Sequence, residues 1–306
     1  HDVRTHNVLI VDPHHAMHAK NRGGMERMLG HLGWTFTYGT AADVAGHDVV
    51  WSPSAPLHID KHPCVKFIFG PQFSNLPDHR FVHVNNTHHN GVYIIPSAWV
   101  VRLWRSRLKP VPHVTLPLER LPFPVDTTRF APTPTVTSRD LVVVYFKYRA
   151  AADLAAVRAA LRNEAVREFS YFAGYNEADY LSALQRAKYG TIVDGYESQG
   201  FAIQEALSCD VPLLVWDTYA MRQVVPRTWQ GDDPCTTVPY WSHQCGEIVT
   251  TQAEMRSVLP RFVRKVSAGA YTPRRYVLRE LSTKTCARNL AELLETIVTC
   301  GHPPTL

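Results

Sequence analysis

Glu197-Ser-Gln-Gly-Phe-Ala-Ile-Gln-Glu205 is the segment from which the fold is best inferred. The apolar run 189–193 precedes it and has the length of a short buried strand. Apolar residues at helical spacing follow Gly200 until Pro212 ends the pattern, and the apolar run 213–215 comes next. The segment therefore predicts a strand, loop, helix and strand, with one carboxylate in the loop and another inside the helix.

The residue types of this unit suit a nucleotide sugar. Backbone N–H groups at the start of a helix stabilise a diphosphate, and a glycine such as Gly200 lets a ligand approach them. Glu205 is placed to accept hydrogen bonds from ribose hydroxyls, as the acidic residue of a dinucleotide fold does. Glu197, nearer the loop tip, is expected to face the sugar. Two glutamates at this spacing are also common on surface helices, so the spacing alone decides nothing.

The same segment resembles the donor-binding signature of retaining GT-B glycosyltransferases, the glycosyltransferase family 4-like group. Matching segments occur in the family's order at Gly23-Gly24-Met-Glu26-Arg27, 122–132 and 171–181. The resemblance implies an α/β fold of GT-B architecture, with two Rossmann-like domains facing each other across a cleft. It also implies a hexosyl- or pentosyltransferase, which moves a sugar from a nucleotide-sugar donor to a glycan or another hydroxyl acceptor with retention of anomeric configuration.

The domain boundaries follow from a proline-rich stretch at 110–134, which is typical of a linker. We expect an N-terminal Rossmann-like acceptor-side domain at 1–122, a linker at 123–137, and a C-terminal donor domain at 138–306. In the family the last helices cross back toward the first domain, so the resemblance allows the last helix to pack there.

Two cations follow the first predicted strand of the donor domain. Lys147 and Arg149 come directly after the run 141–146, at the strand end where open α/β sheets bind ligands. We expect them to neutralise the departing diphosphate. The family commonly has an arginine here and a lysine about five residues later, so which phosphate each contacts stays open. The predicted catalytic residues are Lys147, Arg149, Glu197 and His88, and the predicted donor-binding residues are Gly23, Gly24, Lys147, Arg149, Glu197, Ser198, Gln199, Gly200, Phe201 and Glu205.

The first half of the chain begins with the apolar strand 8–11 and a histidine-rich loop, and a helix is expected from about Gly24 to Leu32. Because no Gly-x-Gly-x-x-Gly follows that strand, a dinucleotide-binding enzyme is disfavoured. Later apolar runs predict strands at 34–38, 48–51, 65–69, 80–84 and 92–95. Loop residues after these strands are expected on the acceptor side, namely His14, His15, Gln72 and His88. The family often has a histidine beside the transferred sugar, and His83, His88 and His89 compete for that place.

Composition excludes several classes of partner. The formal charge of +5 is spread along the chain, so no nucleic-acid partner is expected. No apolar run reaches the roughly 20 residues that span a bilayer. The Trp- and Arg-rich helix predicted at 98–108 is expected to pack on a core rather than to contact a membrane surface.

The six cysteines form no Cys-x-x-Cys pair, which favours reduced thiols and a cytoplasmic location. We expect no cofactor and no metal, since His14 and His18 have no carboxylate or thiolate nearby to complete a ligand set.

Two alternatives remain open at this point. One is another GT-B enzyme, either a sugar-nucleotide epimerase or a phosphorylase. The other is a non-catalytic module that binds a sugar nucleotide or a glycan. The sequence does not specify the donor base, the sugar or the acceptor.

Overall fold

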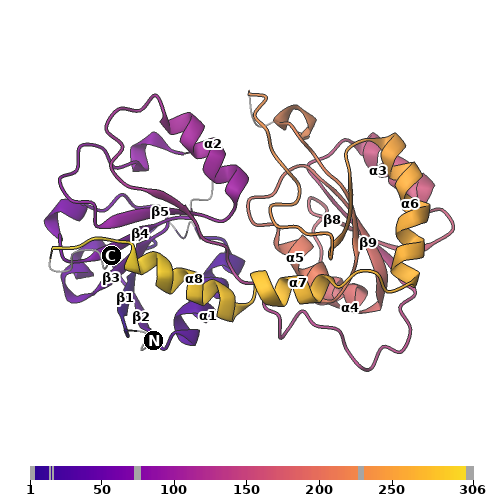
Figure 1. Cartoon of the computed structure of the whole chain (residues 1–306), viewed down its shortest axis with the longest axis horizontal. Helices are drawn as coiled ribbons and strands as arrows, with labels where there is room; N and C mark the ends of the chain where they lie inside the picture. Colours follow the sequence, from indigo (N-terminus) through magenta and orange to yellow (C-terminus); the bar gives the residue numbers. More distant parts are fainter. Residues whose placement is uncertain (1–3, 14, 16, 72–76, 227–230, 301–306) are drawn as a thin grey trace. The chain divides into compact units, whose positions relative to one another are not determined.

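The computed structural model describes residues 4–13, 15, 17–71, 77–226 and 231–300, and the chain divides into two compact units (Figure 1). Unit 1 comprises His1–Pro124 and Thr283–Leu306, and unit 2 comprises Val125–Ser282. The division after Pro124 falls within the expected linker 123–137. The C-terminal segment from Thr283 onward belongs to unit 1, and it begins with the last helix, for which the resemblance allowed packing on the first domain.

Unit 1 is built on a parallel sheet with strand order β2-β1-β3-β4-β5-β6. Its strands are β1 (Asn7–Ile10), β2 (Thr35–Tyr38), β3 (Val49–Ser52), β4 (Lys66–Phe69), β5 (Gly91–Ile95) and β6 (Leu118–Arg120). Its helices are α1 (Ala19–His31), α2 (Ala98–Leu108) and α8 (Thr283–Glu295), with short 3-10 turns η1 (Ala41–Gly46), η2 (Ile59–Lys61) and η3 (His79–Phe81). Every residue of β3 and β5 is buried, as is usual for strands covered on both faces of a parallel sheet.

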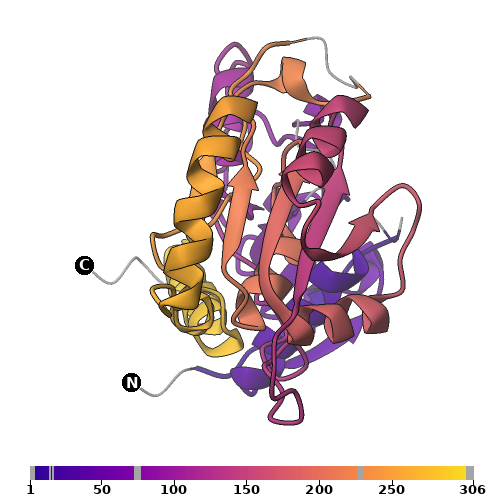
Figure 2. The ribbon, with the colours of Figure 1, turned by 90° about the vertical axis from the view of Figure 1, so that its right-hand side faces the viewer.

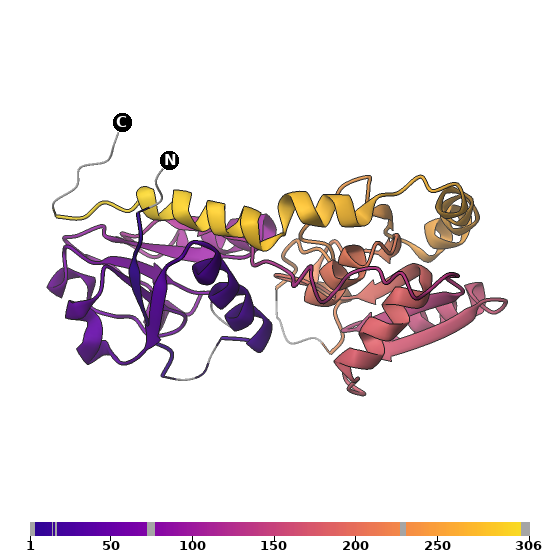
Figure 3. The ribbon, with the colours of Figure 1, turned by 90° about the horizontal axis from the view of Figure 1, so that it is seen from below.

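Helix α8 attaches the C-terminal segment to unit 1 by packing against α1 (Figure 3). Its buried face consists of Cys286, Ala287, Leu290 and Leu294, which recur at helical spacing. The Lys66 Nζ at the start of β4 donates a hydrogen bond of 2.5 Å to the carbonyl oxygen of Leu294. The helix that ends the chain is therefore part of the core of the unit that begins it.

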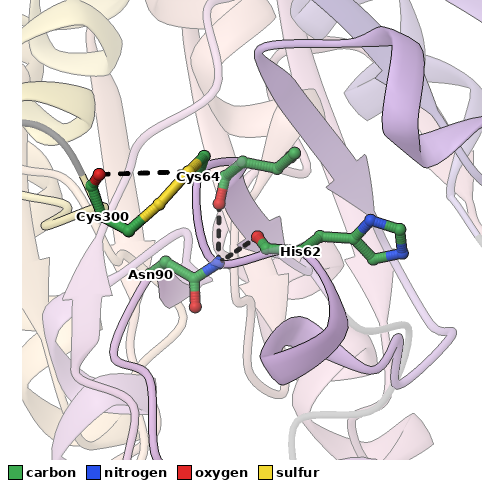
Figure 4. The surroundings of a disulfide bond; sticks show 5 residues. His62, Cys64, Asn90 and Cys300 are labelled. Atoms are coloured by element: carbon green, nitrogen blue, oxygen red, sulfur yellow. Dashed lines mark hydrogen bonds between the residues drawn. A yellow bond between two sulfur atoms is a disulfide. The ribbon is translucent and has the colours of Figure 1, made fainter.

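A disulfide joins Cys64, just before β4, to Cys300, with the two Cα atoms 5.0 Å apart (Figure 4). Beside it, the Asn90 Nδ2 donates to the carbonyl oxygens of His62 and Val65, at 2.9 and 2.7 Å, and so fixes the turn that carries Cys64. The expectation that the cysteines are reduced is wrong for this pair, because the two residues are brought together across 236 positions of sequence. The remaining cysteines, 209, 235, 245 and 286, are buried free thiols.

Unit 2 has a second parallel sheet, with strand order β11-β10-β9-β7-β8. Its strands are β7 (Leu141–Lys147), β8 (Ala165–Ser170), β9 (Ala187–Asp194), β10 (Leu213–Trp216) and β11 (Gly246–Val249). Its helices are α3 (Ala151–Ala160), α4 (Glu177–Arg186), α5 (Phe201–Ser208), α6 (Gln252–Ser267) and α7 (Pro273–Glu280), with the 3-10 turn η4 (Met221–Gln223).

Helices cover both faces of this second sheet, which Figure 2 turns toward the viewer. Leu154 of α3 and Phe262 of α6 are buried in the core on one face. Tyr180 of α4, Ile203 of α5 and Val277 of α7 are buried in the core on the other. Chain order reverses between β7 and β9, and a reversal of this kind opens a crevice at the carboxyl ends of the two strands.

Two local expectations were wrong. The first predicted helix begins at Ala19, several residues before the glycine pair that we expected at its start. The strand expected at 80–84 is absent from the described residues there, which form the end of η3 and a single antiparallel bridge from Val84 to Val114. Among the described residues, no helix is both long and apolar enough to cross a membrane.

Candidate functional site

The site of unit 2 lies where β7 and β9 end side by side. Lys147, the last residue of β7, is in register with Asp194, the last residue of β9. The loop that leaves β9 carries Glu197 and leads into α5. Parallel strands expose their carboxyl ends at one edge of the sheet, so these side chains converge at the reversal of strand order.

Lys147 and Glu197 form the central contact. The Lys147 Nζ and the Glu197 Oε1 are 2.5 Å apart, and the two side chains are only 13% and 14% exposed. The ammonium group also lies 4.6 Å from the centre of the Tyr171 ring and 5.3 Å from that of Tyr148. A cation is thus held between a carboxylate and two aromatic faces, in a setting where electrostatic interactions are stronger than in water.

Burial and charge act in opposite directions on the pKa of Lys147. Burial lowers it, but the carboxyl groups of Glu197 and Asp194 outweigh that effect and raise the pKa above its ordinary value. Lys147 therefore remains an ammonium ion at neutral pH. The pKa of Asp194 lies well above its ordinary value, because the side chain is fully buried and the Glu197 charge adds to the effect of burial, while Lys147 opposes it.

Gly195 allows the two strand ends to approach closely. A Cβ atom on Gly195 would lie 2.8 Å from the Cβ of Tyr148, closer than side chains tolerate. Tyr148 itself has a φ of +53°, a left-handed conformation that is uncommon for a tyrosine. The Gly195 N–H donates to the carbonyl oxygen of Lys147 at 2.9 Å, and the Thr218 Oγ1 donates to the Gly195 carbonyl. These contacts fix the loop that presents Glu197.

Helix α5 begins beside Glu197. Its N-terminal cap is Gly200, whose φ of +71° and ψ of +50° are left-handed, so a glycine suits this position. Gln199 is buried, and its Nε2 donates to the Oε1 of Gln204 at 3.1 Å. Ser198 and Phe201 are half-buried on either side. The predicted donor loop 197–201 is therefore one ordered turn that leads into a helix start, where N–H groups have no intrahelical acceptor.

Arg149 lies close to this cluster in sequence but has a different environment. Its Nη1 donates to the carbonyl oxygens of Asp194 and Trp216, at 3.1 and 2.7 Å, and its Nε donates to Asp153 at 3.0 Å. The residue is only 4% exposed. These contacts favour a role in positioning the ends of β9 and β10 over the phosphate contact that we expected from the sequence.

Glu205 is buried within α5, at 2% exposure. Burial raises the pKa of Cys209 to about 12, and the nearby Glu205 carboxylate adds to this effect. It acts in the same direction on the fully buried Tyr180. Glu205 therefore lies on the core side of the helix, one turn beyond the predicted donor loop, and its contact with a ribose stays a prediction.

In unit 1, the predicted histidines fall at different edges of the sheet. His15 is exposed in the loop that leaves β1, at the carboxyl edge of the sheet, whereas His14 and Gln72 lie outside the described residues. His88 precedes β5, and its backbone N–H donates to Asp60 at 2.9 Å. This places His88 at the amino ends of the strands, which argues against the catalytic and acceptor-side roles that we expected for it.

The other two competing histidines are also explained by local contacts. His83 is buried, with its ring nitrogens 2.7 Å from the Tyr93 hydroxyl and 2.8 Å from the Leu57 carbonyl oxygen. Burial lowers its pKa, which keeps the ring neutral. His89 is exposed, and its Nδ1 lies 3.1 Å from the carbonyl oxygen of Thr115. His83 has a structural role in the core of unit 1.

Gly23 and Gly24 lie inside α1, where one of them has a clear packing role. A Cβ on Gly24 would lie 3.2 Å from the Pro124 Cδ and 3.3 Å from the Phe123 Cδ1. The Arg27 Nη2 on the next turn donates to the Pro124 carbonyl oxygen at 3.0 Å. Gly24 therefore lets α1 pack closely against the end of unit 1, and this packing explains the residue without a donor phosphate.

Comparison with solved structures identifies the fold. No protein-family model matches the sequence, and no curated protein matches it. Sucrose-phosphate synthase from Thermosynechococcus elongatus aligns with 95% of this chain and 98% of its own, with a TM-score of 0.57 and 9% identity. WaaG, a glycosyltransferase involved in lipopolysaccharide biosynthesis, aligns with 94% of this chain and 99% of its own, with a TM-score of 0.52 and 11% identity.

The chain has the two-unit α/β fold of GT-B glycosyltransferases. This confirms the fold class expected from the sequence. At such low identity the likeness concerns the fold alone. Within the described parts of the chain, no three His, Cys, Asp or Glu side chains gather as metal ligands would.

The sequence analysis did not single out Asp194, the last residue of β9, or Gly195, the first residue of the loop that leads to Glu197. Their signal is the dipeptide Asp-Gly directly after the apolar run 189–193. A carboxylate and a glycine at the carboxyl end of a parallel strand are typical of a ligand-binding turn. Asp194 belongs to the same cluster as Lys147 and Glu197.

Proposed function

We propose that this chain is a retaining glycosyltransferase that moves a sugar from a nucleotide-sugar donor to a hydroxyl of a glycan or glycoconjugate. The observation that carries the proposal is the Lys147–Glu197 pair at the reversal of strand order in unit 2. A nearly buried ammonium ion beside a helix start suits a diphosphate better than an uncharged ligand. The GT-B fold supports the same class of reaction.

Lys147 would act on the leaving group. When the bond between the anomeric carbon and the diphosphate oxygen breaks, negative charge grows on the diphosphate, and a preorganised cation stabilises that charge. The N-terminus of α5, which begins at Phe201 after the left-handed Gly200, would contribute backbone N–H groups. The N–H groups are fixed before the donor arrives, and Lys147 has only to turn from Glu197 to the diphosphate when the donor binds, so little reorganisation is left for the reaction itself.

The two glutamates would orient the donor. Glu197, in the loop, would accept hydrogen bonds from sugar hydroxyls once Lys147 has turned to the diphosphate. Glu205, deeper in α5, would accept hydrogen bonds from the ribose. Arg149 would act through the backbone, by holding the carbonyl oxygens of Asp194 and Trp216 in place.

The remaining parts of the proposal concern the acceptor and the conditions of the reaction. We assign the acceptor to unit 1, where His15 lies at the carboxyl edge of the sheet. No metal and no cofactor are needed in this scheme, because Lys147 supplies the positive charge.

The sequence alone favours a cytoplasmic location. The Cys64–Cys300 disulfide is evidence against that location, since disulfides persist mainly in oxidising compartments.

The test is donor hydrolysis followed by proton NMR across UDP-, GDP-, TDP-, CDP- and ADP-sugars. We expect slow hydrolysis of one donor, and the anomer released first reports on retention. Lys147→Met should lower that rate about 100-fold, the typical effect of removing one preorganised charge-stabilising group. Lys188→Met is the matched control: Lys188 is also 2.5 Å from a glutamate, Glu164, but it lies near the start of β9, away from the site.

Each alternative gives a different result in this assay. An epimerase would convert the donor into its epimer with no acceptor present, and a phosphorylase would show the absorbance of bound pyridoxal phosphate. A binding module would broaden donor resonances without turnover, and an enzyme that needs its acceptor would show transfer only when a glycan is added. If no donor bound at all, or if Lys147→Met and Lys188→Met behaved alike, the proposal would fail.

A further inference from the structure

The cluster at the ends of β7 and β9 contains two carboxyl groups, Asp194 and Glu197, but only one ammonium group, that of Lys147. With Lys147, Glu197 and Asp194 all ionised, one ammonium ion would lie between two carboxylates, which leaves a net charge of −1 beside the proposed diphosphate site. Such a charge would repel the ligand, because electrostatic interactions are strong where side chains are buried. A single additional proton would make the cluster neutral.

The hydrogen bonds of Asp194 indicate where that proton lies. Its Oδ1 accepts a hydrogen bond of 2.6 Å from the Gly195 N–H. Its Oδ2 is buried and has no donor directed at it among the described residues. The side chain is fully buried, and the nearby Glu197 carboxyl raises its pKa. Two ionised carboxylates repel each other and have no proton to share, so a hydrogen bond between them needs one of them to be protonated.

We propose that Asp194 carries this proton, donates it in a hydrogen bond to Glu197, and thereby lets Glu197 release Lys147 when a diphosphate binds. The inference rests on the proposed function, which supplies the diphosphate. In the ligand-free protein Glu197 accepts from both neighbours. When Lys147 turns to the ligand, the Asp194 hydrogen bond alone stabilises the Glu197 charge. Asp194 is therefore a positioning residue that acts through Glu197.

The other polar groups around Asp194 do not stabilise its ionised side chain, so Asp194 rather than Glu197 is the carboxyl group that carries the proton. After β7, the Arg149 guanidinium contacts the backbone oxygen of Asp194. Tyr145 has its own pKa raised by burial and by the two carboxylates, so it stays neutral. Asp217, after β10, accepts from the hydroxyl of Thr236 and the N–H of Thr237, at 2.9 and 2.7 Å. The Thr237 Oγ1 donates to the Asp194 carbonyl oxygen at 3.0 Å.

The remaining nearby groups are the aromatic rings of Tyr171 and Tyr148, which face Lys147. Of these side chains, only Lys147 is a cation in contact with a carboxylate oxygen of the pair, and that oxygen belongs to Glu197. Lys147 therefore stabilises the ionised form of Glu197, while Asp194 lacks a comparable partner. This asymmetry places the proton on Asp194.

The experiment compares Asp194→Asn with Asp194→Ala, using UDP, GDP, TDP, CDP and ADP as ligands in isothermal titration calorimetry. The amide of the asparagine variant still donates to Glu197, whereas the alanine variant has no donor. At about pH 7.5, where the diphosphates have already lost their last proton, we expect the asparagine variant to bind like the wild type. The alanine variant should bind at least about tenfold more weakly, the usual loss for a hydrogen bond to a charged group.

Controls separate this effect from general damage. Asp140→Asn neutralises an exposed aspartate of the same unit, which pairs with Arg186, and should leave binding unchanged. Circular dichroism and the unfolding temperature check that each variant is folded. If the asparagine variant bound as weakly as the alanine variant, an ionised Asp194 would be required and the inference would be wrong.

A second measurement needs no ligand and so separates this inference from the proposed function. Difference infrared spectroscopy of the ligand-free wild type minus the asparagine variant should show the C=O stretch of a protonated carboxylic acid at neutral pH. Bands of an ionised carboxylate in its place would overturn the inference, even if donors bind. Absence of diphosphate binding, with the protonated band present, would instead count against the proposed function and the release of Lys147, but not against the protonated Asp194.

Discussion

The guanidinium Nη1 of Arg149 lies 2.7 Å from the carbonyl oxygen of Trp216, the last residue of β10. The same nitrogen lies 3.1 Å from the carbonyl oxygen of Asp194, the last residue of β9. A side chain that leaves the end of β7 thus satisfies two buried carbonyl groups on neighbouring strands. The guanidinium also lies 5.0 Å from the Trp216 ring. Arg149 fixes the spacing of the strand ends that carry the proposed donor site.

Arg149→Met should therefore destabilise unit 2. The substitution leaves two buried carbonyl oxygens and Asp153 without this donor, and we expect a loss of about 2–4 kcal/mol in the free energy of unfolding. Urea unfolding followed by hydrogen exchange of unit 2 peptides measures it. Arg158→Met, which breaks a more exposed ion pair with Glu168, should cost much less, because water screens an exposed pair. Equal losses in the two variants would contradict the role assigned to Arg149.

Asp194 makes the stability of unit 2 depend on pH. Its pKa is raised by burial and by Glu197, so between the unfolded and folded pKa values the folded state binds more protons than the unfolded state. The contribution of Asp194 to stability is therefore fully present at low pH and is lost as pH rises through this window, by up to about 1.4 kcal/mol per pH unit. Asp194→Asn removes this contribution.

The measurement for Asp194→Asn is the urea midpoint of unit 2 at several pH values from about 5 to about 8. The slope against pH should be shallower in the variant. It should not reach zero, because burial also raises the pKa of Asp217, which acts in the same direction. Identical slopes in wild type and variant would show that Asp194 is ionised in both states.

The donor loop could be predicted from sequence because its signals are local. The apolar run before Glu197, the glycine at 200 and the helical spacing after it lie within a few residues of one another, and the structure has β9, a left-handed Gly200 and α5 there. The pairing of Lys147 with Glu197 was not predicted, because it spans fifty residues and depends on β9 lying beside β7. Strand order is a property of the whole sheet.

His88 shows how an error in one strand affects a site. A loop before a strand and a loop after a strand have the same polar composition, so the edge of the sheet can be assigned only if the strands are correct. The predicted strand 80–84 placed His88 after a strand, whereas β5 begins at Gly91 and places His88 before one. The packing role of Gly24 was not predicted for a similar reason, because its contact with Phe123 and Pro124 is a tertiary contact.

Glu205 gives a prediction about the ribose. If its carboxylate binds the ribose hydroxyls, a 2′-deoxy nucleoside diphosphate should bind the wild type about 10- to 100-fold more weakly than the ribose form, as expected for a hydrogen bond to a charged group. In Glu205→Ala the two ligands should bind with nearly equal affinity, because the partner of the hydroxyl is gone. Calorimetry with both ligands on the wild type and on Glu205→Ala gives the four affinities of a thermodynamic cycle. An unchanged preference for ribose in the variant would rule out Glu205 as its partner.

The Cys64–Cys300 disulfide should stabilise unit 1, because it ties the segment after α8 to the turn before β4. Cross-linking restricts the unfolded chain, so we expect Cys64→Ser to lower the free energy of unfolding of unit 1 by about 2–4 kcal/mol. Protein isolated without reductant should show four reactive thiols after denaturation, the cysteines at 209, 235, 245 and 286. Cys286→Ser is the control for loss of a sulfur, since this cysteine forms no disulfide, and it should leave the Cys64–Cys300 bond intact. Six thiols in the freshly isolated protein would mean that the bond does not form in the cell, and would support the cytoplasmic location expected from the sequence.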